Sequence, residues 1–131
     1  DEVIVAVAAS HKEGPIFDQE TRFAAEEALK EYPNVCVKGF NCLLVDFVRE
    51  QKAHIVVKGL RAITDFEYEF QLTALNYELS KDLETFFIMS PPKYMTFELI
   101  VREMASMGGD VKQFVPECVE RALIEYFNEA Y

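Results

Sequence analysis

The chain has 131 residues, of which 50% are hydrophobic and 27% are charged, and its formal net charge is -10. This composition is typical of a folded domain and excludes a disordered chain. The acidic balance excludes a protein that binds nucleic acid over its whole surface, because such binding needs many Lys and Arg contacts to phosphates. No apolar run approaches the roughly 20 residues of a membrane span, and the first residues lack the basic region of a signal peptide.

Short apolar runs alternate with helical patterns along the chain. The run at residues 3–9 is continuous, as in a strand covered on both faces of a parallel sheet, and similar runs predict strands at 35–37, 55–57 and 85–88. Helices are expected at residues 18–32, 43–51, 65–79, 98–106 and 116–128. Asp18 is the expected N-cap of the first helix, and the Thr64-Asp65-Phe66-Glu67 segment has the spacing of a capping box for the third.

Alternation of this kind predicts one α/β domain over residues 1–131, a doubly wound parallel sheet with helices on both faces. Ligands bind beyond the carboxyl ends of the strands in such sheets, which here points to the loops at residues 10–17, 39–43 and 58–65. Cys36, Cys42 and Cys118 have no C-x-x-C spacing, so we expect reduced cysteines in a cytoplasmic protein rather than a disulfide framework or a zinc site.

The segment V56-V-K-G-L-R places two cations directly after an apolar run in this acidic chain. Lys58 supplies a point charge, Arg61 supplies a planar fork suited to phosphate oxygens, and Gly59 allows close approach of a ligand and backbone angles closed to other residues. The start of the next helix adds free N–H groups. The pattern favours a phosphate site, although K-G-L-R alone also fits two solvated cations.

The longer pattern K-G-L-R-x-x-x-D-F-E-Y-E strongly resembles the phosphopantetheine adenylyltransferase family. Segments G39-F, L43-L-V-D-F, Y94-M-T-F, V101-R-E and G108-G-D-V match the same family in the same order, so the resemblance covers essentially the whole chain. It implies a Rossmann-like nucleotidyltransferase fold and transfer of the adenylyl group of ATP to 4'-phosphopantetheine. The products would be dephospho-coenzyme A and pyrophosphate. It also implies Mg²⁺ with ATP, a homohexamer, and coenzyme A as a candidate inhibitor.

The resemblance also implies roles for individual residues. Lys58 would contact the pantetheine phosphate, and the backbone of Leu43 and Leu44 would contact the pantetheine arm. The residues implied for ATP binding are Gly59, Leu60 and Arg61 at the phosphates, Glu69 at the adenosine, Tyr94, and Arg102 after the triphosphate loop. Such a reaction depends mainly on positioning two phosphorylated substrates and stabilising charge on phosphorus.

The chain departs from the family at three places. It has no T-x-G-H motif, and neither His11 nor His54 replaces that histidine, so no catalytic residue and no metal ligand is assigned. Glu13 stands where the family has a lysine. The family's serine-rich triphosphate loop is replaced around Glu98, whose carboxylate would repel phosphate. The alternative function is therefore a non-catalytic relative that binds a nucleotide or coenzyme A, or only forms an oligomer.

The family's first strand is also absent, and it is central in a sheet of order 3-2-1-4-5. The strands expected at 3–9 and 55–57 should therefore have unpaired inner edges. Three explanations stay open: a trimmed enzyme, a slot closed by re-pairing or by another chain, and an edited non-catalytic relative. Phe66, Phe70, Leu72 and Leu75 lie in an expected helix that is apolar around its circumference, so they are core residues or subunit contacts.

Overall fold

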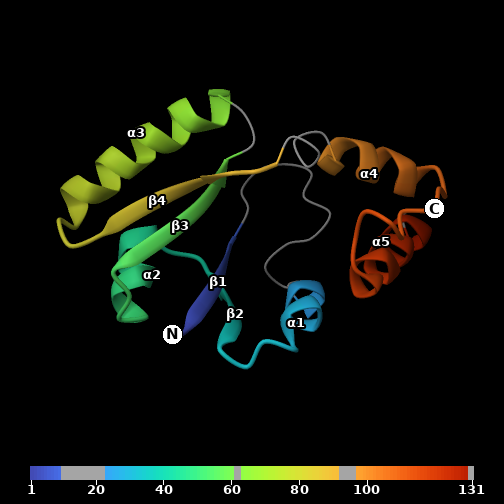
Figure 1. Cartoon of the computed structure of the whole chain (residues 1–131), viewed down its shortest axis with the longest axis horizontal. Helices are drawn as coiled ribbons and strands as arrows, with labels where there is room; N and C mark the ends of the chain where they lie inside the picture. The colour runs from blue at the N-terminus through green and yellow to red at the C-terminus, as the bar shows by residue number, and fades with distance from the viewer. Residues whose placement is uncertain (10–22, 61–62, 92–96, 130–131) are drawn as a thin grey trace. The chain divides into compact units, whose positions relative to one another are not determined.

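The structure, a computed structural model, describes residues 1–9, 23–60, 63–91 and 97–129 (Figure 1). Strands and helices alternate up to the last helical pair, which confirms the predicted α/β class. The elements in chain order are β1 (Val3–Ala8), α1 (Phe23–Leu29), β2 (Val35–Phe40), α2 (Leu44–Glu50), β3 (Ile55–Leu60), α3 (Ile63–Leu79), β4 (Glu84–Met89), α4 (Phe97–Ser106) and α5 (Glu117–Glu129).

The predicted elements all exist, with differences at their ends. β2 and β3 continue for three residues beyond the predicted strands, so Lys58 and Gly59 lie inside β3 rather than in the loop after it. α3 begins at Ile63, so Thr64 lies within the helix and the predicted N-cap at Thr64 is wrong. The predicted N-cap Asp18 lies outside the described residues.

The strands form two parallel two-stranded sheets. β1 pairs with β2 from Val3↔Val35 to Ala8↔Phe40, and β3 pairs with β4 in a second parallel ladder. Within the described part of the chain, β1 and β3 have no other strand partner. This is the pairing expected of a 3-2-1-4-5 sheet without its central strand, with one edge of β1 and one edge of β3 unpaired.

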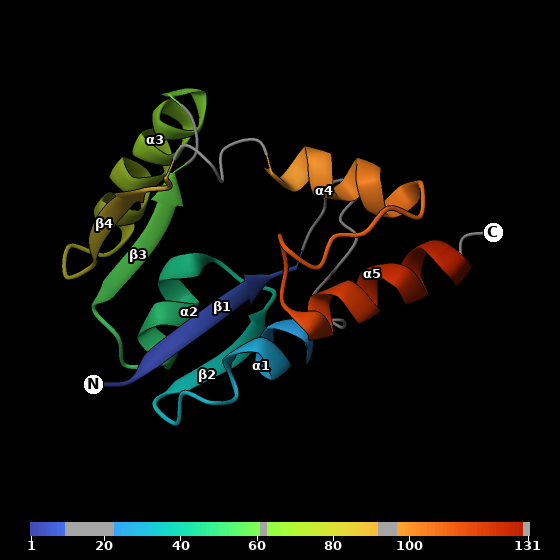
Figure 2. The ribbon, with the colours of Figure 1, turned by 45° about the vertical axis from the view of Figure 1, so that its right-hand side comes forward.

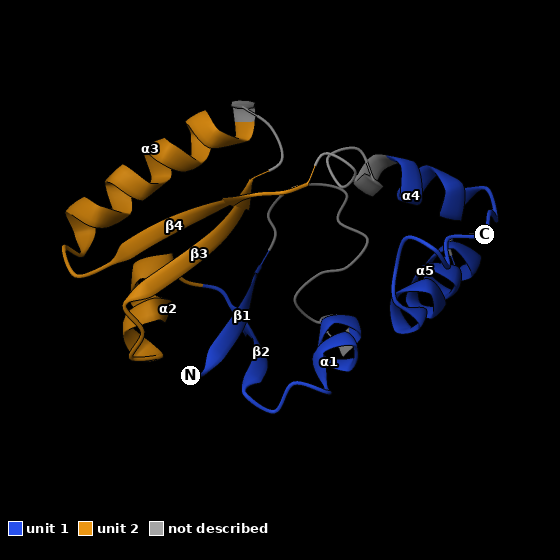
Figure 3. Ribbon diagram, viewed as in Figure 1, with its two compact units in different colours: residues 1–41, 99–131 blue, residues 42–98 orange. Residues whose placement is uncertain are grey.

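The chain divides into two compact units, residues 1–41 with 99–131 and residues 42–98 (Figure 3). In the first unit α1 lies beside β2 (Figure 2) and also contacts α5, where the Cys118 thiol donates to the carbonyl of Ala24 at 3.5 Å. Val101, Val111 and Leu123 are its buried apolar residues. None of the described helices is long and apolar enough to cross a membrane.

The second unit packs α2 and α3 against one face of the β3–β4 sheet. Its core consists of Val45, Val48 and Leu83, with Val56 of β3 packed against this cluster. α2 ends where Lys52 adopts a left-handed conformation, with φ of 56°, which stops the helix before β3 begins. The opposite face of the sheet is bare: Ile55, Val57, Phe86 and Ile88 are 55–60% exposed.

Candidate substrate-binding site on β3

Lys58 lies on the covered face of β3. Side chains alternate along a strand, and Lys58 shares its face with the half-buried Val56 and the buried Leu60. Its ammonium donates to Oε2 of Glu69 in α3, with an Nζ to Oε2 distance of 2.6 Å. The Lys58 and Glu69 side chains are 21% and 26% exposed. The cation is therefore held by one specific carboxylate and still reaches the solvent.

The Lys58–Glu69 pair differs from three other ion pairs among the described residues. Each of those joins residues three positions apart in sequence, with side chains 46–71% exposed, as in Lys30–Glu27, Arg49–Asp46 and Lys81–Glu78. Pairs of that kind add little to stability because water screens them. Lys58 and Glu69 instead connect a strand to a helix and are mostly covered, so their geometry is set by the fold.

The helix α3 turns its polar stripe toward the sheet. Its half-buried positions repeat every three or four residues and are mostly polar: Asp65, Glu69, Leu72, Thr73 and Asn76. Its exposed positions are largely apolar: Phe66, Tyr68, Phe70, Leu75, Tyr77 and Leu79. Phe66 also packs edge-on against Phe87 of β4, with ring centroids 5.9 Å apart. Glu69 thus belongs to the half-buried stripe of α3, which places its carboxylate on the side of the helix that faces the strand.

Gly59 and Leu60 follow Lys58 at the carboxyl end of β3. Gly59 does not have a positive φ, so its predicted use of angles closed to other residues is wrong. A Cβ at Gly59 would meet only Ser90 Oγ, at 4.0 Å, so the protein itself leaves room for a side chain there. Leu60 is only 3% exposed, so its side chain is not available to a ligand.

The predicted pantetheine-arm residues stand at the start of α2. Leu43 is the N-cap residue, and its side chain is 61% exposed, whereas Leu44 packs against the core cluster of the unit. The carbonyl of Leu43 accepts from the N–H groups of Asp46 and Phe47 at 3.0 and 3.1 Å. Leu43 therefore offers an exposed apolar surface in the same unit as Lys58, Gly59 and Glu69.

The remaining predicted site residues belong to the first unit or are not described. Arg102 is half-buried in α4, within the first unit. Arg61 and Tyr94 lie outside the described residues, as do His11 and Glu13, and the side chain of Glu98 is not described. The structure thus brings together one predicted pair of site residues, Lys58 with Glu69.

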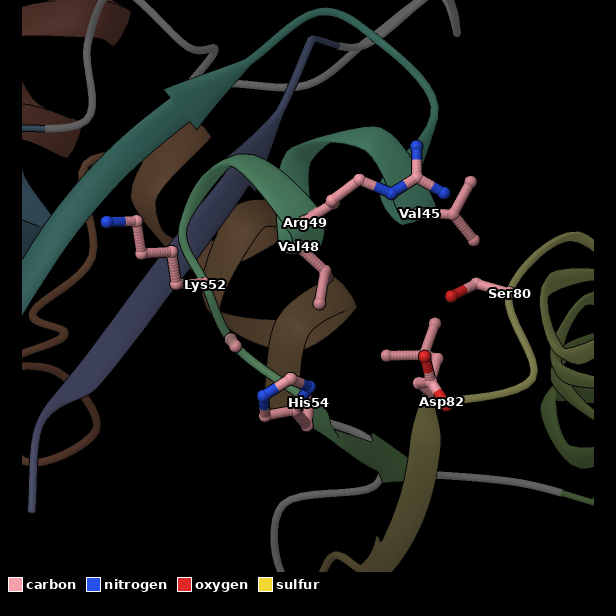
Figure 4. A pocket seen from close by; sticks show the side chains of 9 residues that line it. Val45, Val48, Arg49, Lys52, His54, Ser80 and Asp82 are labelled. Atoms are coloured by element: carbon pink, nitrogen blue, oxygen red, sulfur yellow. The ribbon is translucent and has the colours of Figure 1, made fainter.

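A shallow hollow of about 120 Å³ lies at the other end of the β3–β4 sheet (Figure 4). Val48, His54, Ser80 and Asp82 line it, and the side chain of Lys52 reaches away from Ser80. His54 precedes β3 and is about 13 Å along the strand from Lys58. His54 is therefore not adjacent to Lys58 on the strand, and its exclusion as a replacement for the family's histidine stays a prediction.

A protein-built metal site is not present in the part of the chain that the structure describes. No group of three or more His, Cys, Asp or Glu side chains is placed there to hold an ion. Mg²⁺ commonly binds through substrate phosphates and water with one or two carboxylates, so it requires no such cluster.

The sequence analysis missed the direct contact between Lys58 and Glu69. It assigned the two residues to different ligands, and 11 positions separate them in the chain. The available signal was the period of two in the strand. Val56 and Leu60 are apolar and lie on either side of Lys58 at that period, so Lys58 belonged on the face that a helix covers.

Comparison with known proteins decides the family. A family model described as cytidylyltransferase-like matches residues 1–107. A phosphopantetheine adenylyltransferase from Hahella chejuensis is 45% identical over 97% of this chain and 80% of its own length. One from Ralstonia nicotianae is 48% identical over 95% of this chain and 76% of its own length.

The chain belongs to the phosphopantetheine adenylyltransferase family. This confirms the resemblance that the K-G-L-R-x-x-x-D-F-E-Y-E pattern carried, and with it the nucleotidyltransferase class and the Rossmann-like fold. The two relatives are named for phosphopantetheine, a substrate that carries a phosphate. In this chain β3 carries a cation, Lys58.

Proposed function

We propose that this protein transfers the adenylyl group of ATP to 4'-phosphopantetheine, giving dephospho-coenzyme A and pyrophosphate. The observation that carries the proposal is the mostly covered Lys58 ammonium at the carboxyl end of a parallel strand, in a chain of this family. Ligands of open α/β sheets bind at that end of the strands. A positioned cation there suits a substrate whose phosphate must be held during transfer.

The proposed roles of the site residues follow the fold. Lys58 binds the phosphate of phosphopantetheine, and the exposed Leu43 lies along its apolar arm with Leu44 behind it. The ATP phosphates lie against the backbone of Gly59, Leu60 and Arg61. Glu69, Tyr94 and Arg102 complete the ATP site in this proposal. Gly59 suits a close approach because nothing in the described chain fills the space of its missing Cβ.

The proposal includes a cofactor, an inhibitor and a compartment. Mg²⁺ enters with ATP and is held by the phosphates of the nucleotide, where it offsets their negative charge. Coenzyme A is the proposed inhibitor because it contains the same pantetheine arm as the substrate. The cytoplasm is the proposed location, in line with the three free cysteines.

We also propose that the protein works as a homo-oligomer, with a hexamer as the expected assembly. The support is the set of large apolar side chains exposed on α3, where Phe70, Leu75 and Leu79 are 51–58% exposed. Large apolar side chains gathered at a protein surface are typical of an interface rather than of a surface left in water. Of the four residues expected to be core or subunit contacts, Leu72 is half-buried, whereas Phe66, Phe70 and Leu75 are exposed, which supports subunit contact for those three.

A second candidate function is binding of ATP or coenzyme A without catalysis. It is favoured by Glu98, which stands where the family has its serine-rich triphosphate loop and whose carboxylate would repel phosphate. Lys58 and Gly59 would then hold ligands without turnover.

Pyrophosphate release from ATP and 4'-phosphopantetheine separates the two candidates. The proposal predicts release that depends on both substrates and on Mg²⁺, and weaker ATP binding by Arg61→Ala. The matched control is Arg49→Ala, because Arg49 lies in α2, lines the hollow of Figure 4 and belongs to an exposed ion pair. Ligand binding with no pyrophosphate release would favour the non-catalytic candidate, and unchanged ATP affinity in Arg61→Ala would remove Arg61 from the site.

A further inference from the structure

The positive charge of Lys58 is already compensated in the ligand-free protein. Its ammonium lies 2.6 Å from a carboxylate oxygen of Glu69, and both side chains are about three-quarters covered. The two charges cancel, so the ion pair as a whole carries no net charge. A phosphate that comes to Lys58 therefore meets an occupied cation.

We propose that Glu69 is a positioning residue for Lys58: it is the counter-ion that holds the ammonium in the ligand-free protein and that a phosphate must displace. This inference rests on the proposed function, because it takes the phosphate of 4'-phosphopantetheine as the incoming anion. It adds that Glu69 acts on the phosphopantetheine site through Lys58, in addition to the ATP role that the family resemblance implies.

The physical argument begins with the two charges. A phosphate monoester carries more negative charge than a carboxylate near pH 7 and offers three acceptor oxygens. If both groups approach the same ammonium, the phosphate lies within a few ångströms of the Glu69 carboxylate, where like charges repel strongly because neither is fully in water. Glu69 therefore lowers the affinity for every anion at Lys58.

A phosphate can still replace the carboxylate, because it brings more negative charge and three acceptor oxygens to the ammonium. An anion with a single charge gains little by replacing one carboxylate with another. The register of α3 points Glu69 at the strand, so the carboxylate can leave Lys58 only by a change of side-chain rotamer.

Glu69→Gln tests the proposal because it keeps the size of the side chain and an oxygen that can accept from Lys58, but removes the charge. The control is Glu78→Gln, which removes an ion pair of similar length, with 2.7 Å between Glu78 Oε2 and Lys81 Nζ. Glu78 lies in the same helix, about 13 Å further along the axis. Titration calorimetry would measure the affinity of each protein for 4'-phosphopantetheine and for neutral pantetheine.

We expect Glu69→Gln to bind 4'-phosphopantetheine about fivefold more tightly than the wild type, the size of a partly screened ion pair. Pantetheine affinity should not change, and Glu78→Gln should match the wild type with both ligands. The gain should shrink as NaCl is raised, because salt screens the repulsion. A role of Glu69 in holding the fold together would produce none of these changes.

Two failures are distinguishable. If the wild type binds 4'-phosphopantetheine more tightly than pantetheine but Glu69→Gln shows no gain, the counter-ion proposal is wrong and the proposed function stands. If the wild type does not distinguish the two ligands, both are wrong. Should Glu69→Gln fail to fold by circular dichroism, Glu69→Asp retains the charge but draws it back from Lys58. A phosphate affinity equal to or below that of the wild type would then overturn the proposal.

Discussion

The two faces of the β3–β4 sheet have opposite characters. The face under α2 and α3 carries a charged pair, Lys58 with Glu69, next to the core cluster, while the other face exposes Ile55, Val57, Phe86 and Ile88. A protein surface usually shows the reverse distribution. In the second unit the charged pair therefore lies on the covered side of the sheet, and the large apolar side chains lie on the side that is exposed in this structure.

The largest expected difference between the two faces of the sheet is in unfolding free energy, measured by mutating two neighbouring valines that lie on opposite faces of β3. Val56→Ala should lower the free energy of unfolding by about 1–2 kcal/mol, because two methyl groups leave a packed cluster. Val57→Ala should cost less than about 0.5 kcal/mol, because Val57 is 60% exposed. Urea denaturation of both variants measures the difference.

Equal losses of unfolding free energy in Val56→Ala and Val57→Ala would contradict the difference between the two faces. They would mean that the face bearing Val57 is covered in solution. Repeating the denaturation over a range of protein concentrations would then show whether the cover is another copy of the chain, because stability that depends on association rises with concentration.

Gly59→Ala should change folding stability and ATP affinity in opposite directions. The chain leaves room for the added Cβ, and Gly59 has no positive φ, so stability should rise by about 0.5 kcal/mol through a less flexible unfolded state. ATP affinity should fall if the nucleotide approaches this backbone closely. Thermal denaturation and calorimetry on the same sample would show the two changes in opposite directions. A variant with wild-type ATP affinity would remove Gly59 from the proposed site.

The smallest effect is expected at an exposed ion pair, which gives the baseline for Lys58–Glu69. The hydrogen bond from Lys30, together with its charge, lowers the pKa of Glu27 below the ordinary value. The pair therefore adds stability above the ordinary carboxyl pKa and loses it as the pH falls through the lowered pKa. Both side chains are largely exposed to water, so Lys30→Gln should raise the pKa of Glu27 without a measurable change in the free energy of unfolding.

An NMR titration of the Glu27 carboxyl group measures that shift, with Lys81→Gln as a control that leaves Glu27 alone. A clear loss of stability in Lys30→Gln would mean that exposed pairs matter here as much as the covered one. The contrast between the covered and the exposed ion pairs would then fail.

Much of the fold could be predicted from the sequence because it depends on local pattern. Continuous apolar runs predicted the four strands of the described residues, whereas α1 ends at Leu29, three residues before the predicted end at residue 32. The start of α3 was predicted too late: the capping-box spacing favoured Thr64 as the N-cap, whereas the helix already includes Ile63. The free edges of β1 and β3 were predicted from the absent central strand rather than from local pattern.

The candidate site was predicted only in part. Lys58 and Glu69 were both identified, but their contact depends on how α3 lies on β3, which no local pattern contains. The exposure of Phe86 and Ile88 was also missed, because an apolar run predicts a strand covered on both faces and does not say which cover is present.

The most direct test of the account is the affinity of Lys58→Met for 4'-phosphopantetheine and pantetheine, measured by calorimetry beside Lys81→Met. Methionine keeps most of the apolar stem and removes the charge. Loss of a charged hydrogen bond should weaken 4'-phosphopantetheine binding about 10- to 100-fold and leave pantetheine binding unchanged, while Lys81→Met behaves as the wild type. If Lys58→Met still preferred the phosphorylated ligand by the wild-type ratio, Lys58 would not be the phosphate-binding residue.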